Sequence, residues 1–298
     1  MKKSISFFLI VCVFFLGTPL FLFGKQNNGV RYKEIGLNGV NKEAVKILRK
    51  KYLTVHRAWL YKTLDDAEPY RIYVRNEIEK RKMPKILEYL PVVESNYNPK
   101  AKSKSGATGM WQFMKNSVHP FLVCNEYVDE RLDPWKSTDG ALRKLKDNYN
   151  TFGDWLLAIT AYNCGVGALK KAISKAGSKD FWYLREHKYL SEQASGYVPK
   201  LLAIADVAEN ARYYGIAMPT ARDANGKTIE MRAGKFDYVK VKGSVSLNWL
   251  SKELRIDKDE LYALNSSLVK GVTPPKAEYR IRLPEGMGEY ARYVLQRL

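Results

Sequence analysis

The stretch Glu94–Phe113, ESNYNPKAKSKSGATGMWQF, follows an apolar helix and opens into a loop of small residues. Apolar residues at three- and four-residue steps make the helical face in front of it: Ile86, Leu87, Leu90 and Val93. This helix is predicted to begin at Pro84, bend at Pro91 and end before Asn98-Pro99. Glu94 is therefore expected near the C-terminal end of a helix whose apolar face buries its carboxylate.

The surroundings of Glu94 indicate proton-transfer chemistry. Burial raises the pKa of a glutamate toward neutral pH, where the side chain can donate a proton as a general acid. The helix dipole also disfavours a carboxylate at this end of a helix. Loop 100–117 is rich in Ser, Gly and Ala, and Ser105, Gly106 and Gly109 are expected to let its backbone approach the carboxylate. The alternative is an exposed glutamate at a helix end, which needs no chemical role.

Most of residues 37–214 are predicted to be helical. Five residues form the apolar stripe of a first helix: Val45, Leu48, Tyr52, Val55 and Trp59. A charged helix is expected over 70–82, and others over 137–149, 154–163 and 197–208.

The pattern changes after Gly215. Residues 219–235 are polar and contain glycine, so they are expected to form a linker. Alternation over 239–245 and 279–283 predicts two strands, and the segment between them predicts two short helices, the second capped by Asp257. The result is a small βααβ module, followed by a short helix from Gly288.

The N-terminal segment has the pattern of an export signal. Lys2 and Lys3 precede an uncharged, mostly apolar run from Ile5 to Phe23. Cleavage after this run and retention of it as a membrane anchor both remain open. Cys12 lacks the small neighbours that a lipoprotein cysteine prefers, so lipidation is not expected. The chain is predicted to act outside the cytoplasm.

The chain is strongly basic, with 50 Lys and Arg against 31 Asp and Glu and a formal net charge of +19. Residues 1–24 contribute only two lysines, so the excess charge belongs to the rest of the chain. An anionic polymer or surface is the favoured partner. The export signal and the lack of a basic helix stripe argue against nucleic acid.

No metal or other cofactor is expected. His56, His119 and His187 show no metal-ligand spacing with one another or with the cysteines. Cys124 and Cys164 are predicted to be free thiols, although they could pair in an oxidising compartment.

Three motifs occur in order along the chain. The pattern E-S-x-x-N-P-x-A-x-S-x-x-G-A-x-G-x-x-Q begins at Glu94, A-Y-N-C-G at Ala161, and G-Y-V-P-K at Gly196. Together they resemble the soluble lytic transglycosylase domain, a branch of the lysozyme-like superfamily. The segment Asp129–Pro134 and the N-terminal helices are similar to the membrane-bound lytic murein transglycosylase D branch. The resemblance covers most of the chain and implies a mainly α fold, with a lysozyme-like helical catalytic domain.

The resemblance implies roles for individual residues. Glu94 would be the sole catalytic acid and base. Six residues would form the substrate-binding set: Ser95, Ser103, Gln112, Tyr162, Asn163 and Tyr197. Tyr162 and Tyr197 could instead be core residues of their helices, and Trp111 could either pack in the interior or stack on a sugar.

Two departures from the family pattern concern the second and third motifs. Cys164 replaces a small alanine, which is a mild change of volume. Gln193 and Ala194 stand where the family commonly has Glu-Thr, so a helper carboxylate is not expected there.

The C-terminal module resembles LysM, a peptidoglycan-binding fold, through Tyr238–Val241, Asp259–Asn265 and the closing strand. Ser244 stands where LysM usually has aspartate, and Thr273–Pro275 replaces the usual Pro-Gly turn. Sugar binding and a structural brace for the catalytic domain both remain open.

The activity implied by the resemblance is cleavage of the bond between N-acetylmuramic acid and N-acetylglucosamine in peptidoglycan, with formation of 1,6-anhydro ends. An ordinary glycosidase needs two carboxyl groups. Here one carboxyl group would suffice, because the 2-acetamido group of the substrate stabilises the cationic carbon. The expected partner is the glycan strands of peptidoglycan in the periplasm. The alternatives are a lysozyme-type hydrolase on the same fold and a non-catalytic wall-binding protein.

The predicted organisation has six parts: 1–24 a signal peptide or membrane anchor, 25–83 an N-terminal helical extension, 84–215 the catalytic domain, 216–235 a linker, 236–284 the LysM-like module and 285–298 a C-terminal helix.

Overall fold

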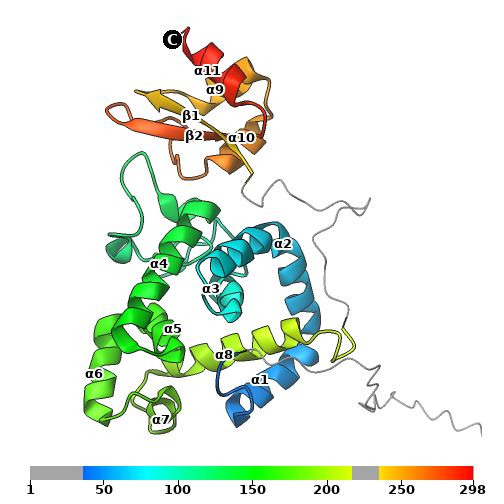
Figure 1. Ribbon diagram of the computed structural model, residues 1–298, viewed down its shortest axis with the longest axis vertical. Helices are drawn as coiled ribbons and strands as arrows, with labels where there is room; N and C mark the ends of the chain where they lie inside the picture. The colour runs from blue at the N-terminus through cyan, green and yellow to red at the C-terminus, as the bar shows by residue number, and fades with distance from the viewer. Residues whose placement is uncertain (1–35, 217–234, 298) are drawn as a thin grey trace, which may run out of the picture.

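The computed structural model of the chain describes residues 36–216 and 235–297, and most of them are helical (Figure 1). The first part contains α1 (Glu43–Leu53), α2 (Arg57–Lys80), the 3-10 helix η1 (Lys85–Tyr89), α3 (Leu90–Ser95), the 3-10 helices η2 (Lys115–Ser117) and η3 (Glu130–Leu132), α4 (Pro134–Phe152), α5 (Trp155–Cys164), α6 (Val166–Ala176), α7 (Phe181–Glu186) and α8 (Glu192–Glu209). The second contains β1 (Asp237–Lys242), α9 (Leu247–Leu254), α10 (Lys258–Leu264), β2 (Glu278–Leu283) and α11 (Gly288–Leu295). The predicted signal or anchor and most of the predicted linker lie outside the described residues.

Helix ends follow the capping residues in the sequence. The side chain of Asp133 accepts hydrogen bonds from the first amides of α4, and Asp154 and Ser191 do the same for α5 and α8. Gly153 ends α4 in the left-handed conformation, at a φ of 74°. The predicted helices over 137–149, 154–163 and 197–208 therefore all exist, with somewhat different bounds.

The predicted first helix over 45–59 is wrong, because the chain turns at Thr54 and His56 between α1 and α2. The charged helix expected over 70–82 begins much earlier, at Arg57, and runs through Pro69. Packing outweighs the missing amide of that proline, since α2 buries five apolar residues along its length: Leu60, Leu64, Ala67, Val74 and Ile78.

The single helix predicted after Pro84 is also wrong. The chain forms a 3-10 turn over η1 and then the short α3, in which Pro91 lies in the first turn, where a proline is tolerated. Asn96 ends α3 in the left-handed conformation, at a φ of 56°. The predicted position of Glu94 in the last helical turn is confirmed.

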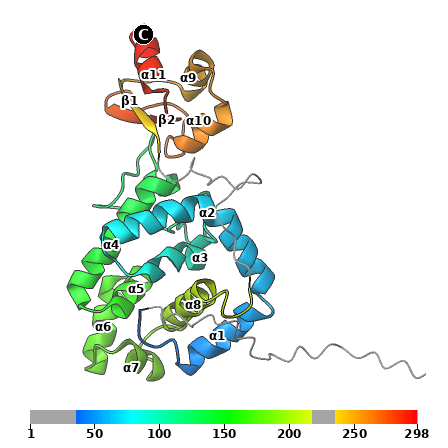
Figure 2. The same cartoon turned by 45° about the vertical axis from the view of Figure 1, so that its right-hand side comes forward.

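The centre of the helical part is α3, which lies within a ring of α2, α4, α5 and α8 (Figures 1 and 2). Leu157 and Ile159 of α5 and Leu201 and Ile204 of α8 are fully buried there. Helices α1 and α2 contribute to the same hydrophobic core, with α1 packed along α8. The site on α3 is thus surrounded by rigid helices.

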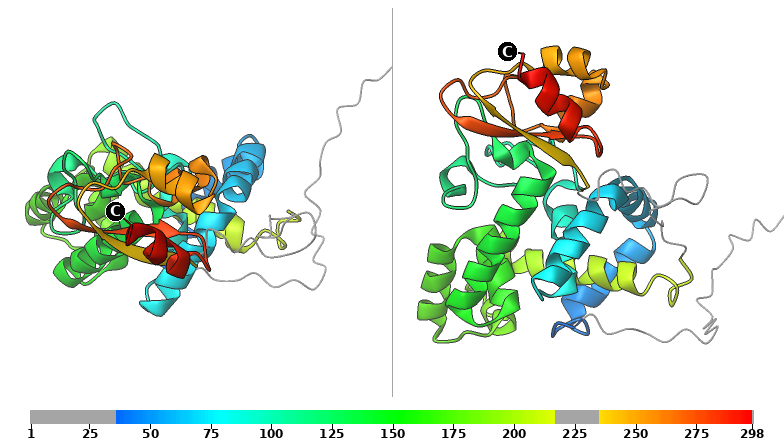
Figure 3. Two further views of the ribbon diagram at one scale, coloured as in Figure 1. Left: turned by 90° about the horizontal axis from the view of Figure 1, so that it is seen from above. Right: turned by 45° about the horizontal axis from the view of Figure 1, so that its top comes forward.

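The C-terminal part confirms the predicted order of strand, two helices and strand. Strands β1 and β2 pair antiparallel, with Val239 opposite Ile281. Their inward side chains and those of α9 and α10 form a separate hydrophobic core, and α11 covers it with Ala291 and Val294. This module lies against the N-terminal end of α4 and the loop before it (Figure 3). Within residues 36–216 and 235–297, no helix has the length and hydrophobicity needed to cross a bilayer.

Candidate active site

Glu94 lies where α3, α5 and α8 meet. Its side chain is partly buried, and the hydroxyl of Tyr197 on α8 donates a hydrogen bond to Oε1. Tyr162, near the end of α5, is 8% exposed, and its hydroxyl donates to the carbonyl of Trp111 at 2.8 Å. The structure therefore brings residues from all three predicted motifs together around one carboxylate.

Burial of the carboxylate raises the pKa of Glu94 to about 7. The hydrogen bond from Tyr197 and the charges of Lys144 and Lys200 act in the opposite direction and keep the rise from being larger. A glutamate with this pKa is protonated for part of the time at neutral pH. Glu94 can therefore donate a proton and afterwards accept one.

The loop after α3 is fastened to the helices around Glu94. Ser95 donates from Oγ to the carbonyl of Met110 at 2.7 Å, and the next carbonyl, of Trp111, accepts the hydrogen bond from Tyr162. Ser95 and Tyr162 therefore hold two successive peptide units of the loop. Their hydroxyls are occupied by this contact.

Ser103 and Gln112 shape the same loop. The Ser103 hydroxyl accepts a hydrogen bond from the amide of Ala107 at 2.9 Å and so closes a tight turn. Gln112 has a φ of 50°, and its Nε2 donates to the carbonyl of Gly109 at 2.8 Å. Both side chains are partly buried, and both act on the shape of the loop.

Asn163 differs from the other predicted site residues. It is partly buried at the end of α5, directly after Tyr162, and its side chain has no hydrogen-bond partner among the residues that the structure describes. An amide in this position has its full hydrogen-bonding capacity available for a ligand.

Two expectations about the loop need correction. Gly109 makes room for Arg131 and not for Glu94, because a Cβ at Gly109 would lie 1.7 Å from the carbonyl oxygen of Arg131. At Gly106 a Cβ would meet nothing within 4 Å, so no close approach requires that glycine. Trp111 is 0% exposed and donates from Nε1 to Thr138 on α4 at 2.9 Å, so its ring packs in the interior and offers no face to a sugar.

Lys144 on α4 is a site residue that sequence reasoning missed. Its ammonium lies over the rings of Phe113 and Tyr162, 5.0 Å from the Tyr162 centroid, and its charge acts on Glu94. Burial lowers the pKa of Lys144, and the charge of Glu94 partly offsets this effect. The sequence offers little signal for this role: Lys144 lies between the apolar residues Leu142 and Leu145 of the predicted helix over 137–149.

The described residues show no metal site and no disulfide. No group of three or more His, Cys, Asp or Glu within 36–216 and 235–297 could hold a metal ion. Cys124 and Cys164 are free thiols, as predicted.

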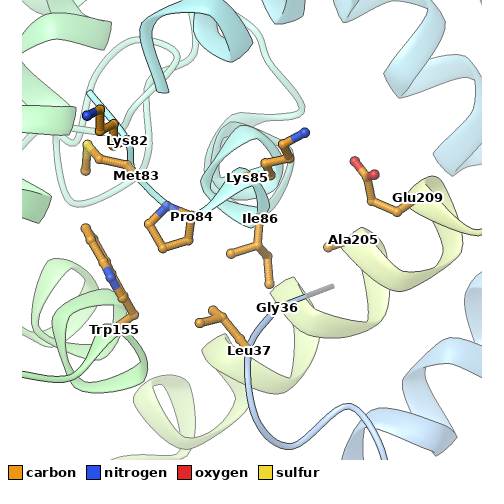
Figure 4. Close-up of a pocket in the computed structure, with 10 residues that line it drawn as sticks. All are labelled: Gly36, Leu37, Lys82, Met83, Pro84, Lys85, Ile86, Trp155, Ala205 and Glu209. Atoms are coloured by element: carbon orange, nitrogen blue, oxygen red, sulfur yellow. The ribbon is translucent and has the colours of Figure 1, made fainter. Parts of the chain in front are cut away.

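A cavity of about 470 Å³ lies at the far ends of α5 and α8 (Figure 4). Its wall includes Trp155, Met83 and Ala205. Ala205 is eight residues along α8 from Tyr197, which corresponds to about 12 Å at the helical rise per residue. This cavity is therefore separate from the Glu94 site.

Comparison with known proteins gives two family matches. Residues 73–185 match the transglycosylase SLT domain, and residues 235–298 match the LysM-like domain of the lytic transglycosylase MltD. The first match contains Glu94, Asn163 and the loop between them. Tyr197 lies outside it.

Individual relatives agree with these matches. The membrane-bound lytic murein transglycosylase D of Escherichia coli K12 is 36% identical over 182 residues, which are 59% of this chain and 39% of that protein. The peptidoglycan transglycosylase gp16 of Escherichia phage T7 is 33% identical over 40% of this chain and 9% of that protein. This chain thus spans well under half the length of either relative.

Among solved structures, the 70 kDa soluble lytic transglycosylase of Escherichia coli aligns with a TM-score of 0.41 and 22% identity, over 57% of this chain and 29% of that one. The family matches identify the two folded parts. The chain therefore combines a transglycosylase SLT domain with the LysM-like domain of the lytic transglycosylase MltD family.

Proposed function

We propose that the chain is a peptidoglycan lytic transglycosylase that cleaves between N-acetylmuramic acid and N-acetylglucosamine and leaves 1,6-anhydro-muramic ends. One observation carries this proposal. Burial raises the pKa of Glu94 to about 7, and the groups that shift this pKa, Tyr197, Lys144 and Lys200, include no second carboxylate. A two-carboxylate glycosidase holds a second acidic side chain across the scissile bond. A single carboxylate suits a reaction in which the substrate supplies the second nucleophile.

The reaction needs two proton transfers at Glu94. The protonated side chain donates its proton to the glycosidic oxygen, and the bond from that oxygen to C1 of the muramyl residue breaks. The acetamido group of the same sugar stabilises the cationic C1. The Glu94 carboxylate then accepts the proton of the C6 hydroxyl while O6 bonds to C1. This step restores the acid and consumes no water.

Tyr197 supports the ionised state of Glu94. Its hydrogen bond stabilises the carboxylate that the first step leaves and fixes the direction in which Oε1 points. A partly buried carboxylate held in this way stays in position between the two transfers.

The other predicted site residues fall into two groups, those whose side chains already hydrogen-bond within the protein and one, Asn163, whose side chain does not among the described residues. Asn163 is proposed to bind the sugar, because its amide has no partner among the described residues. Ser95 and Tyr162 hold the loop at Met110 and Trp111. Ser103 and Gln112 shape the same loop, and their remaining acceptor and donor atoms are proposed to line the sugar site.

The domain boundaries and the location of the protein belong to the same proposal. We place the catalytic domain at residues 84–215 and the LysM-like module at 236–284. The apolar run after Lys3 supports export to the periplasm, with or without anchoring in the membrane.

The test is product analysis after digestion of purified peptidoglycan in water enriched in ¹⁸O. A transglycosylase yields anhydro-muramic ends without ¹⁸O. A hydrolase yields reducing ends that carry ¹⁸O, and this result would refute the proposal in favour of a lysozyme-type enzyme.

The variant Glu94→Gln separates catalysis from binding. It should lose lysis and still sediment with peptidoglycan, whereas Glu192→Gln, an exposed site on α8, should behave as the wild type. If the wild-type chain binds the wall and releases no product, it is a wall-binding protein without catalysis.

A further inference from the structure

The C-terminal module is joined to the catalytic part by main-chain pairing. Val128 forms an antiparallel bridge with Leu268, and the amide of Asp129 donates to the carbonyl of Ser267 at 2.8 Å. Val128 is 3% exposed and belongs to the hydrophobic core of the module. The segment before α4 is therefore part of the module's own fold.

A buried ion pair adds to this junction. Arg282 on β2 donates from Nη1 to Oδ2 of Asp133, and the side chains of both residues are almost fully buried. The other carboxylate oxygen of Asp133 accepts from the amides of Trp135 and Lys136 at the start of α4. The guanidinium of Arg282 also lies over the Trp135 ring, 4.8 Å from its centroid. The module thus contacts the N-terminal cap of the helix that carries Lys144.

The segment 127–133 also contacts the loop 101–113 that follows α3. Asp129 accepts two hydrogen bonds from Arg131, at 2.9 and 2.7 Å, and so fixes the guanidinium. Arg131 then donates from Nη1 to the carbonyls of Gly106 and Phe113, each at 3.3 Å. These two carbonyls lie on opposite limbs of the loop, so one side chain closes it.

Backbone contact reinforces this arrangement. The carbonyl of Arg131 occupies the space where a Cβ of Gly109 would be. Directly after Gly109 come Met110 and Trp111, whose carbonyls accept from Ser95 and Tyr162 beside the acid. A continuous set of contacts therefore runs from the module to the surroundings of Glu94.

We propose that the C-terminal module is a positioning element of the active site: through the segment 127–133 and its Arg131, it fixes the loop 101–113 against the helices that hold Glu94. The loop Ser266–Val269 of the module is paired with this segment, which makes that edge unavailable to a glycan. Arg131 is a positioning residue, since it contacts the loop and not the acid. The inference uses the proposed activity only as a readout.

The experiment compares full-length variants in turnover and in hydrogen exchange of the peptide 101–113. Arg131→Met removes both carbonyl contacts and keeps most of the side-chain volume. It should lower kcat by about tenfold or more, with KM changed less than twofold, because a displaced loop misplaces groups around the acid. Exchange in 101–113 should accelerate, while the core peptide 201–205 of α8 stays protected.

Arg282→Met tests the module's part in this arrangement. It should change kcat and loop exchange in the same direction as Arg131→Met, and Arg282→Lys should restore most of the activity. Arg280→Met is the matched control, because Arg280 lies on the same strand and its guanidinium stacks 4.5 Å from the centroid of the exposed Tyr238. This control should keep wild-type kcat and exchange. If Arg282→Met fails to fold, Asp129→Asn provides the test, since it loosens Arg131 and leaves the module intact.

Unchanged kcat and loop exchange in folded Arg131→Met and Asp129→Asn would overturn the inference. So would faster exchange confined to the module in Arg282→Met, with kcat as in the wild type. Either result leaves the proposed activity standing, because that activity is judged from the products of the wild-type chain. Reducing ends from the wild type would refute the activity and leave the exchange test valid.

Discussion

The Tyr197 hydroxyl donates a hydrogen bond to Oε1 of Glu94 across 103 residues of sequence. The tyrosine comes from the first half of α8 and the glutamate from the last turn of α3. The bond favours the carboxylate and so opposes the rise in pKa that burial causes. It couples the third sequence motif directly to the candidate acid Glu94.

Replacing Tyr197 with phenylalanine should raise the pKa of Glu94 above its wild-type value of about 7. Because the acid must be protonated to act, the wild-type kcat/KM should fall as pH rises through 7. In Tyr197→Phe this fall should move upward by about 0.5–1 pH unit. The measurement is a pH profile of kcat/KM, with Tyr183→Phe on α7 as control. A fall at the wild-type pH in Tyr197→Phe would contradict the assigned hydrogen bond.

Lys144 should act on the same profile by charge alone. Its ammonium favours the carboxylate of Glu94, so Lys144→Met should also move the fall of kcat/KM to higher pH, while Lys144→Arg should leave it in place. Lys146 on the same helix is exposed and stacks on Tyr149, which makes Lys146→Met the control. If Lys144→Arg shifts the profile as far as Lys144→Met, shape rather than charge is responsible.

Ionisation of Glu94 should destabilise the folded state at high pH. The folded pKa lies above that of an unfolded glutamate, so the group's contribution to stability is fully present below about pH 4 and is lost as pH rises through 7. Glu94→Gln removes this dependence, so its free energy of unfolding should rise by about 2–3 kcal/mol relative to that of the wild type between pH 5 and pH 8. Urea unfolding at pH 5 and pH 8 measures the difference. A gain that is equal at both pH values would indicate a cause other than ionisation.

Two glycines of the loop 101–113 form a matched pair. Gly106 and Gly109 both have positive φ, at 87° and 81°, so an alanine is strained by about 1–2 kcal/mol at either position. At Gly109 the new Cβ would also collide with the carbonyl of Arg131. Gly109→Ala should therefore lower the free energy of unfolding by clearly more than Gly106→Ala and should reduce turnover as well. Equal losses in denaturant unfolding would mean that the loop moves freely away from Arg131.

Local patterns predicted much of the helical part, and long-range packing changed the rest. The predicted helices over 137–149, 154–163 and 197–208 exist, but α4 and α8 begin earlier than predicted, directly after the capping residues Asp133 and Ser191. The predicted bounds of the first two helices are wrong because those bounds depend on distant residues. The turn at Thr54 and the passage of α2 through Pro69 depend on packing against distant helices, which periodicity does not record.

The site shows the same division. Glu94 and its place in the last turn of a helix follow from apolar spacing and Asn98-Pro99, since both act over a few residues. The partners that set its chemistry come from other helices: Tyr197 from α8 and Lys144 from α4. No spacing rule connects Lys144 to the glutamate, and neither the burial of Trp111 nor the contact of Gly109 with Arg131 could be derived without the fold.

The sequence by itself determined the type of protein: a basic, mainly helical chain with one candidate acid and a small βααβ module after the helical part. These properties depend on composition and on patterns within one helix or strand. Tertiary structure alone decided how acidic Glu94 is and what holds the loop around it, because burial, charge at a distance and hydrogen bonds between separate elements arise only when the chain is packed.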